Sequence, residues 1–208
     1  MKEWGDVARW VIVVVSGLLL APAAGRGQAC AEPHYRWSEK VDTTLQTRPA
    51  APVDIAAMLT AWAPLSLTSR DMCAPRGARE DSVFVLVGWV RRIRLQESDG
   101  DWHVELTAAP TTPVDSCIIV EIPAERYGVI YSRARAALAS LVDTTQLGPR
   151  GDLRPPVRVR FTGAAFFDGF HQRAVAGGPP HAIQHGRCNS SLRALWELHP
   201  IYGVAAPG

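Results

Sequence analysis

Apolar and polar residues alternate along several short stretches in the second half of the chain. In 102–107, Trp, Val and Leu alternate with His, Glu and Thr, and this period of two predicts a strand with one buried face. Four other stretches have a strand-like pattern: 82–95, 117–122, 157–161 and 195–204. A polar turn with Asp-Gly at its centre, 97–101, predicts a hairpin between the first two strands.

Two segments have apolar residues at helical spacing instead. In 53–62 they recur every three or four positions, with Asp54 as the expected N-cap and Pro64 just beyond the end. The same spacing in 127–142 predicts a helix between the third and fourth strands. Segment 163–193 has no periodicity, and we expect a long loop that can cover a binding surface.

The predicted order of elements is β-β-β-α-β-β, which is the order of a five-stranded OB-like barrel, mainly β with one core helix. In such a barrel the first strand must bend to pair with both the second and the fourth. Gly88, in the middle of the first strand, permits that bend. We therefore expect an OB-like barrel over 82–206, preceded over 30–81 by an extended arm and a short helix.

Four short motifs carry a resemblance to known proteins: Asp99-Gly100-Asp101-Trp102-His103, Glu121-Ile122-Pro123, Phe166-Phe167-Asp168 and Trp196-Glu197-Leu198-His199-Pro200. With them, residues 82–204 resemble the OB-fold superfamily of nuclease-like and nucleic-acid-binding barrels, and most closely a set of uncharacterised exported bacterial proteins. The resemblance implies a fold and a compartment, but no activity. The catalytic Arg, Asp and Glu of the nuclease subgroup have no counterparts here.

Residues 1–29 are expected to be a secretory signal peptide. Lys2 and Arg9 precede the apolar run Trp10–Leu20, which is too short to span a membrane, and small residues follow it. No later run is long enough to span a membrane. A secreted or periplasmic protein is therefore predicted.

Export places the four cysteines in an oxidising compartment, where disulfides are expected. Four cysteines allow three connectivities. Cys117 begins the third predicted strand and Cys188 precedes the fifth, and these strands are neighbours in an OB-like barrel. This placement predicts a Cys117–Cys188 disulfide, which leaves Cys30 to pair with Cys73.

Strand parity places a set of polar residues on the face opposite the core. The second, third and fifth strands lie side by side in such a barrel, so their outward side chains should share one outer surface, either solvated or covered by a loop: His103, Glu105, Glu121, Glu197 and His199. Histidine and carboxylate together suit a binding site, a divalent metal or acid–base chemistry. The alternative is simple cross-strand pairing of His with Glu.

The small net charge of the chain does not favour binding of a large polyanion. The net charge is +2, and removal of residues 1–29, with three basic and two acidic side chains, leaves +1. One local basic stripe is still expected, from outward side chains on the neighbouring first and fourth strands: Arg92, Arg94, Arg158 and Arg160. Such a stripe suits a polyanion, and a solubilising face paired with nearby acids is the alternative.

No cofactor is expected, because the sequence has no phosphate-binding loop, dinucleotide motif or nucleophile elbow. Two weaker metal sites are considered. His181 and His185 have the i, i+4 spacing of a helical zinc pair, and three carboxylates crowd the 97–101 turn.

The sequence favours an exported OB-like binding or interaction module with an unknown partner, such as a polyanion or another exported protein. The alternative is a metal-dependent hydrolase, with phosphodiesters as one candidate substrate class, that uses His103, Glu121, Glu197 and His199. The two differ in geometry: metal ligation requires these four side-chain heads to converge within about 5 Å.

Overall fold

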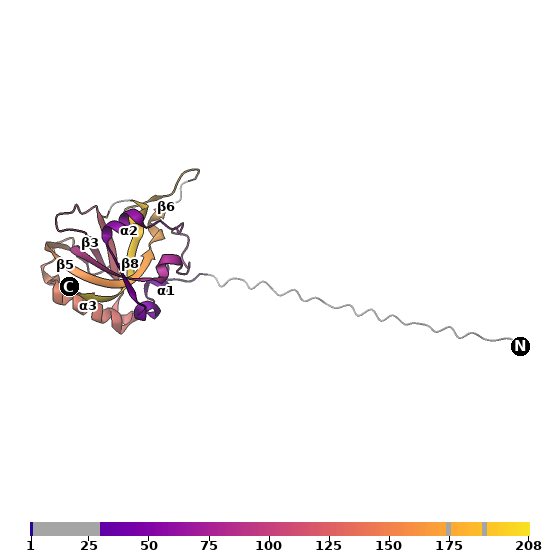
Figure 1. Ribbon diagram of the computed structural model, residues 1–208, viewed down its shortest axis with the longest axis horizontal. Helices are drawn as coiled ribbons and strands as arrows, with labels where there is room; N and C mark the ends of the chain where they lie inside the picture. Colours follow the sequence, from indigo (N-terminus) through magenta and orange to yellow (C-terminus); the bar gives the residue numbers. More distant parts are fainter. Residues whose placement is uncertain (2–29, 174–175, 189–190) are drawn as a thin grey trace.

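The fold is that of a computed structural model, which describes Met1 and residues 30–173, 176–188 and 191–208 (Figure 1). The signal peptide predicted over 1–29 lies, apart from Met1, outside the described residues. Among the residues described, no helix has the length and apolar character needed to cross a membrane.

The protein is mainly β and is built on one mixed sheet of six strands. The strands are β1 (Ala50–Val53), β2 (Val83–Arg94), β3 (Trp102–Thr107), β4 (Cys117–Ile122), β5 (Asp152–Phe167) and β8 (Trp196–Ala205). Their order is β1-β2-β3-β4-β8-β5, and β5 pairs with β2 as well as with β8. The β1–β2 and β4–β8 pairs are parallel, and the other pairs are antiparallel.

The remaining elements are short, apart from α3. The α-helices are α1 (Trp37–Lys40), α2 (Ile55–Ala61) and α3 (Val129–Leu141). The 3₁₀ turns are η1 (Thr44–Thr47), η2 (Ala78–Asp81), η3 (Glu125–Tyr127), η4 (Thr144–Gln146), η5 (Gly169–His171) and η6 (Leu192–Leu195). Two further strands, β6 (Gln172–Arg173) and β7 (His181–Ala182), form a small hairpin of their own.

Most of the predicted elements are present at nearly the predicted bounds. The strands expected over 82–95, 102–107, 117–122 and 195–204 match β2, β3, β4 and β8 to within a residue or so. Asp54 caps α2 as predicted, since its carboxylate accepts a hydrogen bond from the backbone N–H of Ala57 at 2.6 Å.

Three local predictions were wrong. The strand expected over 157–161 is only the middle of the sixteen-residue β5. The stretch 163–193, expected to be irregular, begins as the end of β5 and also contains β6 and β7. The extended arm expected over 30–50 contains α1 and η1 and ends at the start of β1, which pairs with β2.

Apolar side chains from one face of the sheet form the core together with α2 and α3. Figure 1 shows α3 along the lower side of the sheet and α2 near the top. Tyr131, Ala134 and Leu138 of α3 are buried in this core. Gly88 has a packing role, because a Cβ there would lie 3.1 Å from Ile55 Cδ1 and 3.2 Å from Leu106 Cβ. The β2 bulge falls two residues later, between Val90 and Arg92.

Both predicted disulfides are present. The Cα atoms are 5.8 Å apart in Cys30–Cys73 and 4.8 Å apart in Cys117–Cys188, within the usual range for a disulfide. The first ties the start of the N-terminal arm, residues 30–50, to the loop before β2. The second ties β4 to the segment before β8. Two disulfides fit an extracellular location, because such bonds persist in oxidising compartments.

A buried ion pair fixes the arm against the sheet. Arg36 Nη1 lies 2.7 Å from Glu80 Oε1 and Nη2 lies 2.9 Å from Oε2, with both residues almost fully buried. Glu80 Oε1 also accepts a hydrogen bond from the backbone N–H of Phe167. The arm therefore packs over the sheet face that points away from the core.

Candidate functional site

Four of the predicted polar residues meet in one hydrogen-bonded group on β3, β4 and β8. His103 lies directly opposite Glu121 in the β3–β4 ladder, and its Nδ1 is 2.8 Å from Glu121 Oε1. His199 Nδ1 is 3.1 Å from Glu121 Oε2 and 3.0 Å from Glu197 Oε1. Strand parity therefore placed these four residues correctly on one face of the sheet.

This outer face is covered rather than solvated. Glu105, Glu197 and His199 have 0% relative exposure, His103 has 5% and Glu121 has 6%. The arm and the segment before β8 cover the face. Gly186 lies directly against the face with φ +58, and a Cβ there would lie 2.8 Å from Glu105 Oε1 and 3.0 Å from His103 Nε2. Glycine is required at this position both by the backbone conformation and by the space.

Glu105 belongs to a different set of ion pairs. Its carboxylate accepts hydrogen bonds from Arg187 Nε at 2.7 Å and from Arg92 Nη1 at 3.0 Å. Burial alone would raise the pKa of Glu105, but the positive charges of His103 and Arg187 outweigh burial and lower it to about 2. This carboxylate is saturated by protein cations.

The four residues, with Asp101, form what we call the inner network: Asp101, His103, Glu121, Glu197 and His199. Burial disfavours the charged form of His199, but the surrounding carboxylates outweigh burial and hold its pKa well above the usual range. Lys40, His103 and His199 likewise outweigh burial and hold the pKa of Glu121 well below its usual range. Burial and the charge of Glu121 raise the pKa of Glu197 to about 7.

The side chains of the inner network bond to one another and are not aimed at a common empty point. Ligand atoms of Asp101, Glu121 and His199 lie within 4.8 Å of one another, yet His103 Nδ1 is hydrogen-bonded to the Glu121 carboxylate and His199 Nδ1 to the Glu197 carboxylate. On its other side, His199 Nε2 lies 3.1 Å from Asp101 Oδ2, but the two atoms are not aligned for a hydrogen bond. The attraction there is electrostatic.

A pocket of about 400 Å³ opens beside the inner network. Its walls come from the arm, the 97–99 turn and the segment 168–186. The buried charged and imidazole side chains that line it are Lys40, His103, Glu121, Asp168 and His185, and the half-buried His171 lines it beside them. Among the described residues, Glu197 and His199 do not line this pocket, so only part of the inner network can meet a ligand.

Lys40 brings a buried positive charge from the arm into this pocket. Its Nζ lies 3.6 Å from Asp168 Oδ2 and 3.8 Å from Glu121 Oε2, distances of ion pairs without direct hydrogen bonds. Burial would lower the pKa of Lys40, but Asp168 and Glu121 outweigh it and raise the pKa. Lys40 is also the one lysine of the sequence after residue 29.

A second histidine–carboxylate group, which we call the pocket triad, consists of Asp168, His171 and His185. His171 Nε2 is 3.8 Å and His185 Nε2 is 3.9 Å from Asp168 Oδ2. The two imidazole rings stack with centroids 4.4 Å apart. Burial lowers the pKa of His185 to about 3, so this imidazole is neutral and its nitrogen lone pair is available.

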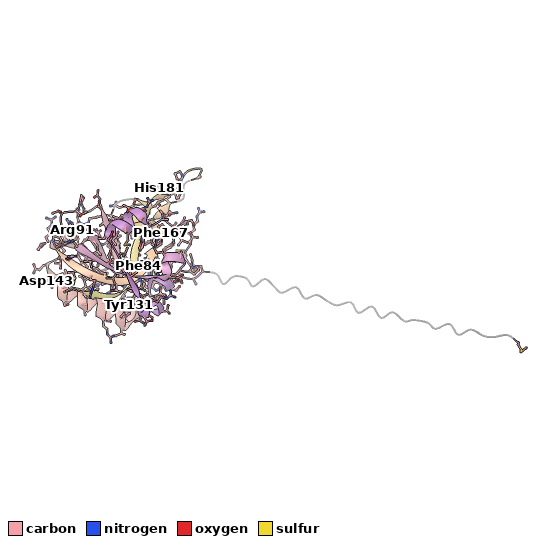
Figure 2. The ribbon with its side chains drawn as sticks, in the orientation of Figure 1. Phe84, Arg91, Tyr131, Asp143, Phe167 and His181 are labelled. Carbon is pink, nitrogen blue, oxygen red and sulfur yellow. A yellow bond between two sulfur atoms is a disulfide. The ribbon has the colours of Figure 1, made fainter. Side chains whose placement is uncertain are left out.

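The predicted helical pair of His181 and His185 does not form. His181 is exposed in the strand β7 and lies at the upper rim of the molecule (Figure 2), whereas His185 is buried in the pocket triad. Ala182 pairs with Gln172 in the β6–β7 hairpin, and this extended backbone replaces the helix that i, i+4 ligation needs.

The predicted basic stripe is also not brought together. Arg92 lies opposite Asp152 on β5, whereas Arg158 lies opposite Trp89. Along β2, Trp89 and Arg92 are three residues apart, about 10 Å, and Arg92 is paired with Glu105 at 3.0 Å. Arg94 pairs with Glu97 at 2.9 Å, and Arg160 lies opposite Val87.

Sequence reasoning missed Lys40, Asp168 and His171 as parts of one site. Asp168 stood in one of the quoted motifs, and Lys40 was noticeable as a lone lysine. Neither signal locates the residue, because the arm and the segment after β5 reach the site only through long-range packing. The family models, curated proteins and solved structures compared with the chain include no match to it.

Proposed function

We propose that the protein is an exported OB-like binding module whose ligand site is the pocket beside the inner network. An OB-like barrel is supported by four pairings: β2 with β3, β2 with β5, β4 parallel to β8, and β8 with β5. It is also supported by the position of α3 between β4 and β5 in the chain. Export is supported by the two disulfides.

One observation carries the assignment of the site. Charged and imidazole side chains from the arm, the sheet and the segment after β5 all reach the same 400 Å³ pocket, although such groups are costly to bury. Pockets with a few converging polar groups are the usual sites for small ligands. The ion pairs of Arg92 with Glu105 and of Arg94 with Glu97 argue against a polyanion lying across the sheet.

A blocking substitution tests this assignment. Ser98 is exposed and lines the pocket, so Ser98→Trp should fill the entrance without touching the inner network. Ser140→Trp, on the exposed face of α3, is the matched control. The measurement is a thermal-shift screen of both variants and the wild type against metal ions, oligonucleotides and glycans.

The proposal expects a compound that raises the melting temperature of the wild type and of Ser140→Trp, but not of Ser98→Trp. A compound that stabilises all three proteins equally binds elsewhere. If no class of compound stabilises the wild type, the pocket is not a binding site for these classes and the proposal fails.

A second candidate function, a metal-dependent hydrolase, is favoured by the geometry of His103. Its Nδ1 is held by Glu121, while its buried Nε2 has no hydrogen-bond partner among the described residues. A carboxylate-oriented imidazole is a common arrangement for proton transfer. If the pocket hydrolyses bis(p-nitrophenyl) phosphate in the presence of zinc, His103→Gln should abolish turnover and leave ligand binding intact.

A further inference from the structure

The pocket triad is the feature of the pocket that the inner network does not explain. We propose that Asp168, His171 and His185 bind one divalent transition-metal ion of the zinc type, through one nitrogen of each histidine and one oxygen of Asp168. The inference rests on the proposed function, because it names the ligand class of the same pocket.

Asp168 and His171 are brought to one side by the 3₁₀ turn that follows β5. Residues three apart in a 3₁₀ turn lie above one another. Asp168 Oδ1 accepts a hydrogen bond from the backbone N–H of Phe170 at 3.0 Å, which fixes the carboxylate. Its other oxygen, Oδ2, faces the two histidines.

His185 reaches the same point from a separate segment. A β-bridge joins His185 to Cys188, which is bonded to Cys117 on β4. His185 Nδ1 lies 3.4 Å from the backbone carbonyl of Ala194, so an Nδ1–H there can donate to it and leave the Nε2 lone pair directed at Asp168. A partner on the far nitrogen is the usual arrangement of a metal-binding histidine.

The distances suit an ion after a small contraction. Ligand atoms about 2.0–2.1 Å from a tetrahedral zinc stand roughly 3.3 Å apart. The two nitrogen-to-Oδ2 distances of 3.8 and 3.9 Å therefore need to shorten by about half an ångström. All three ligand atoms already lie within 4.8 Å of one another.

A second and independent observation points to a missing cation. Glu197 is fully buried, and its Oε2 has no hydrogen-bond partner among the described residues. This oxygen lies 3.5 Å from His185 Nε2, at the edge of the triad. An ion bound to His185 would supply positive charge beside an oxygen that lacks a partner.

The ammonium of Lys40 does not already occupy the position of the proposed cation. Its ammonium is 3.6 Å from Asp168 Oδ2, which is too long for a direct hydrogen bond, and it also lies near Glu121. Two nitrogens and one oxygen favour zinc or a similar transition metal, whereas calcium and magnesium prefer oxygen ligands. Since the triad lines an open pocket, a fourth position is left for water or a ligand.

Zinc titration of the disulfide-intact protein tests the site, with isothermal calorimetry and metal content after dialysis as the measurements. We expect one zinc per chain in the wild type. Asp168→Asn and His171→Ala should each weaken zinc binding 10- to 100-fold, since each removes one ligand. His181→Ala removes an exposed histidine outside the pocket and should leave the affinity unchanged.

The metal site would be overturned by no zinc binding by the folded wild type, by full affinity in both triad variants, or by an equal loss in His181→Ala. Magnesium that competes at equal concentration would also overturn it, because it indicates oxygen ligands alone. If a compound binds the wild type without a metal and Ser98→Trp prevents that binding, the pocket is still supported as a binding site. Only the metal site is then rejected. Circular dichroism of each variant separates lost binding from lost folding.

Discussion

The inner network and the pocket triad contain the same residue types within one small region, yet they differ in how their polar atoms are satisfied. In the inner network His103 Nδ1 is hydrogen-bonded to Glu121 and His199 Nδ1 to Glu197. In the pocket triad both histidines approach Asp168 at 3.8–3.9 Å without a hydrogen bond. Four buried atoms of the network also lack a hydrogen-bond partner among the described residues: Asp101 Oδ2, His103 Nε2, Glu197 Oε2 and His199 Nε2. The network is nevertheless joined by hydrogen bonds that help to hold the fold together, whereas the triad has none between its members and is more available to a ligand.

The difference follows from the elements that position each group. The inner network lies on three paired strands, and the ladder register fixes its spacing. The triad lies on a short turn and on a segment held by a disulfide, so its spacing is not fixed by a ladder. We therefore expect substitutions in the network to change stability most and substitutions in the triad to change binding most.

The largest expected effect is the loss of Glu121. Glu121→Ala leaves His103, His199 and Lys40 without their shared counter-charge in a buried site, which should cost about 3–5 kcal/mol of unfolding free energy. Glu125→Ala, an exposed glutamate a few residues away, should cost less than about 0.5 kcal/mol. Urea unfolding at pH 7 measures both.

Glu121→Gln keeps the shape of the side chain and removes only the charge, so it separates electrostatics from packing. It should lie between the wild type and Glu121→Ala. If Glu121→Ala costs no more than Glu125→Ala, the inner network does not stabilise the fold and the contrast between the two groups is lost.

Parity along the strands was enough to predict which residues share the network's face. A strand alternates its side chains with a period of two, so the assignment of His103, Glu121, Glu197 and His199 needed only the apolar positions between them. The two disulfides followed from the same topology. These parts of the structure are set by local pattern and by strand order.

The burial of that face could not be predicted in the same way. It depends on contacts between residues far apart in sequence, such as Arg36 with Glu80 and Lys40 with Asp168. The arm that supplies Arg36 and Lys40 has no periodicity that indicates what it covers. For β5, Pro155, Pro156 and the small residues 163–165 break the alternation, so only its middle looked like a strand.

The second prediction concerns the pH dependence of the network. Burial would lower the pKa of His103, but Glu105 and Glu121 outweigh burial and raise it to about 9. The folded state therefore holds this proton more tightly than the unfolded state, whose histidine titrates near 6.5. The unfolding free energy that protonated His103 contributes is fully present below pH 6.5 and is lost as the pH rises through about 9.

The expected loss is on the order of 3 kcal/mol between pH 6 and pH 10. It should appear in the wild type and in His181→Gln, measured by urea unfolding across that range. In His103→Gln this part of the pH dependence should be absent. An equal slope in His103→Gln and the wild type would mean that another group carries the effect.

The smallest expected effect sharpens the comparison at Lys40, which touches both groups. Lys40 neutralises Asp168 and Glu121, so a metal ion at the triad must compete with its ammonium for Asp168. Lys40→Met keeps the length of the side chain and removes the charge. Zinc should then bind about tenfold more tightly, which is about 1.4 kcal/mol.

The metal-free protein should lose stability, because Glu121 loses a buried partner. These changes have opposite signs, so calorimetric zinc titration and urea unfolding of the one variant test them together. A loss of zinc affinity in Lys40→Met would mean that the lysine positions Asp168 for the metal and does not compete with it.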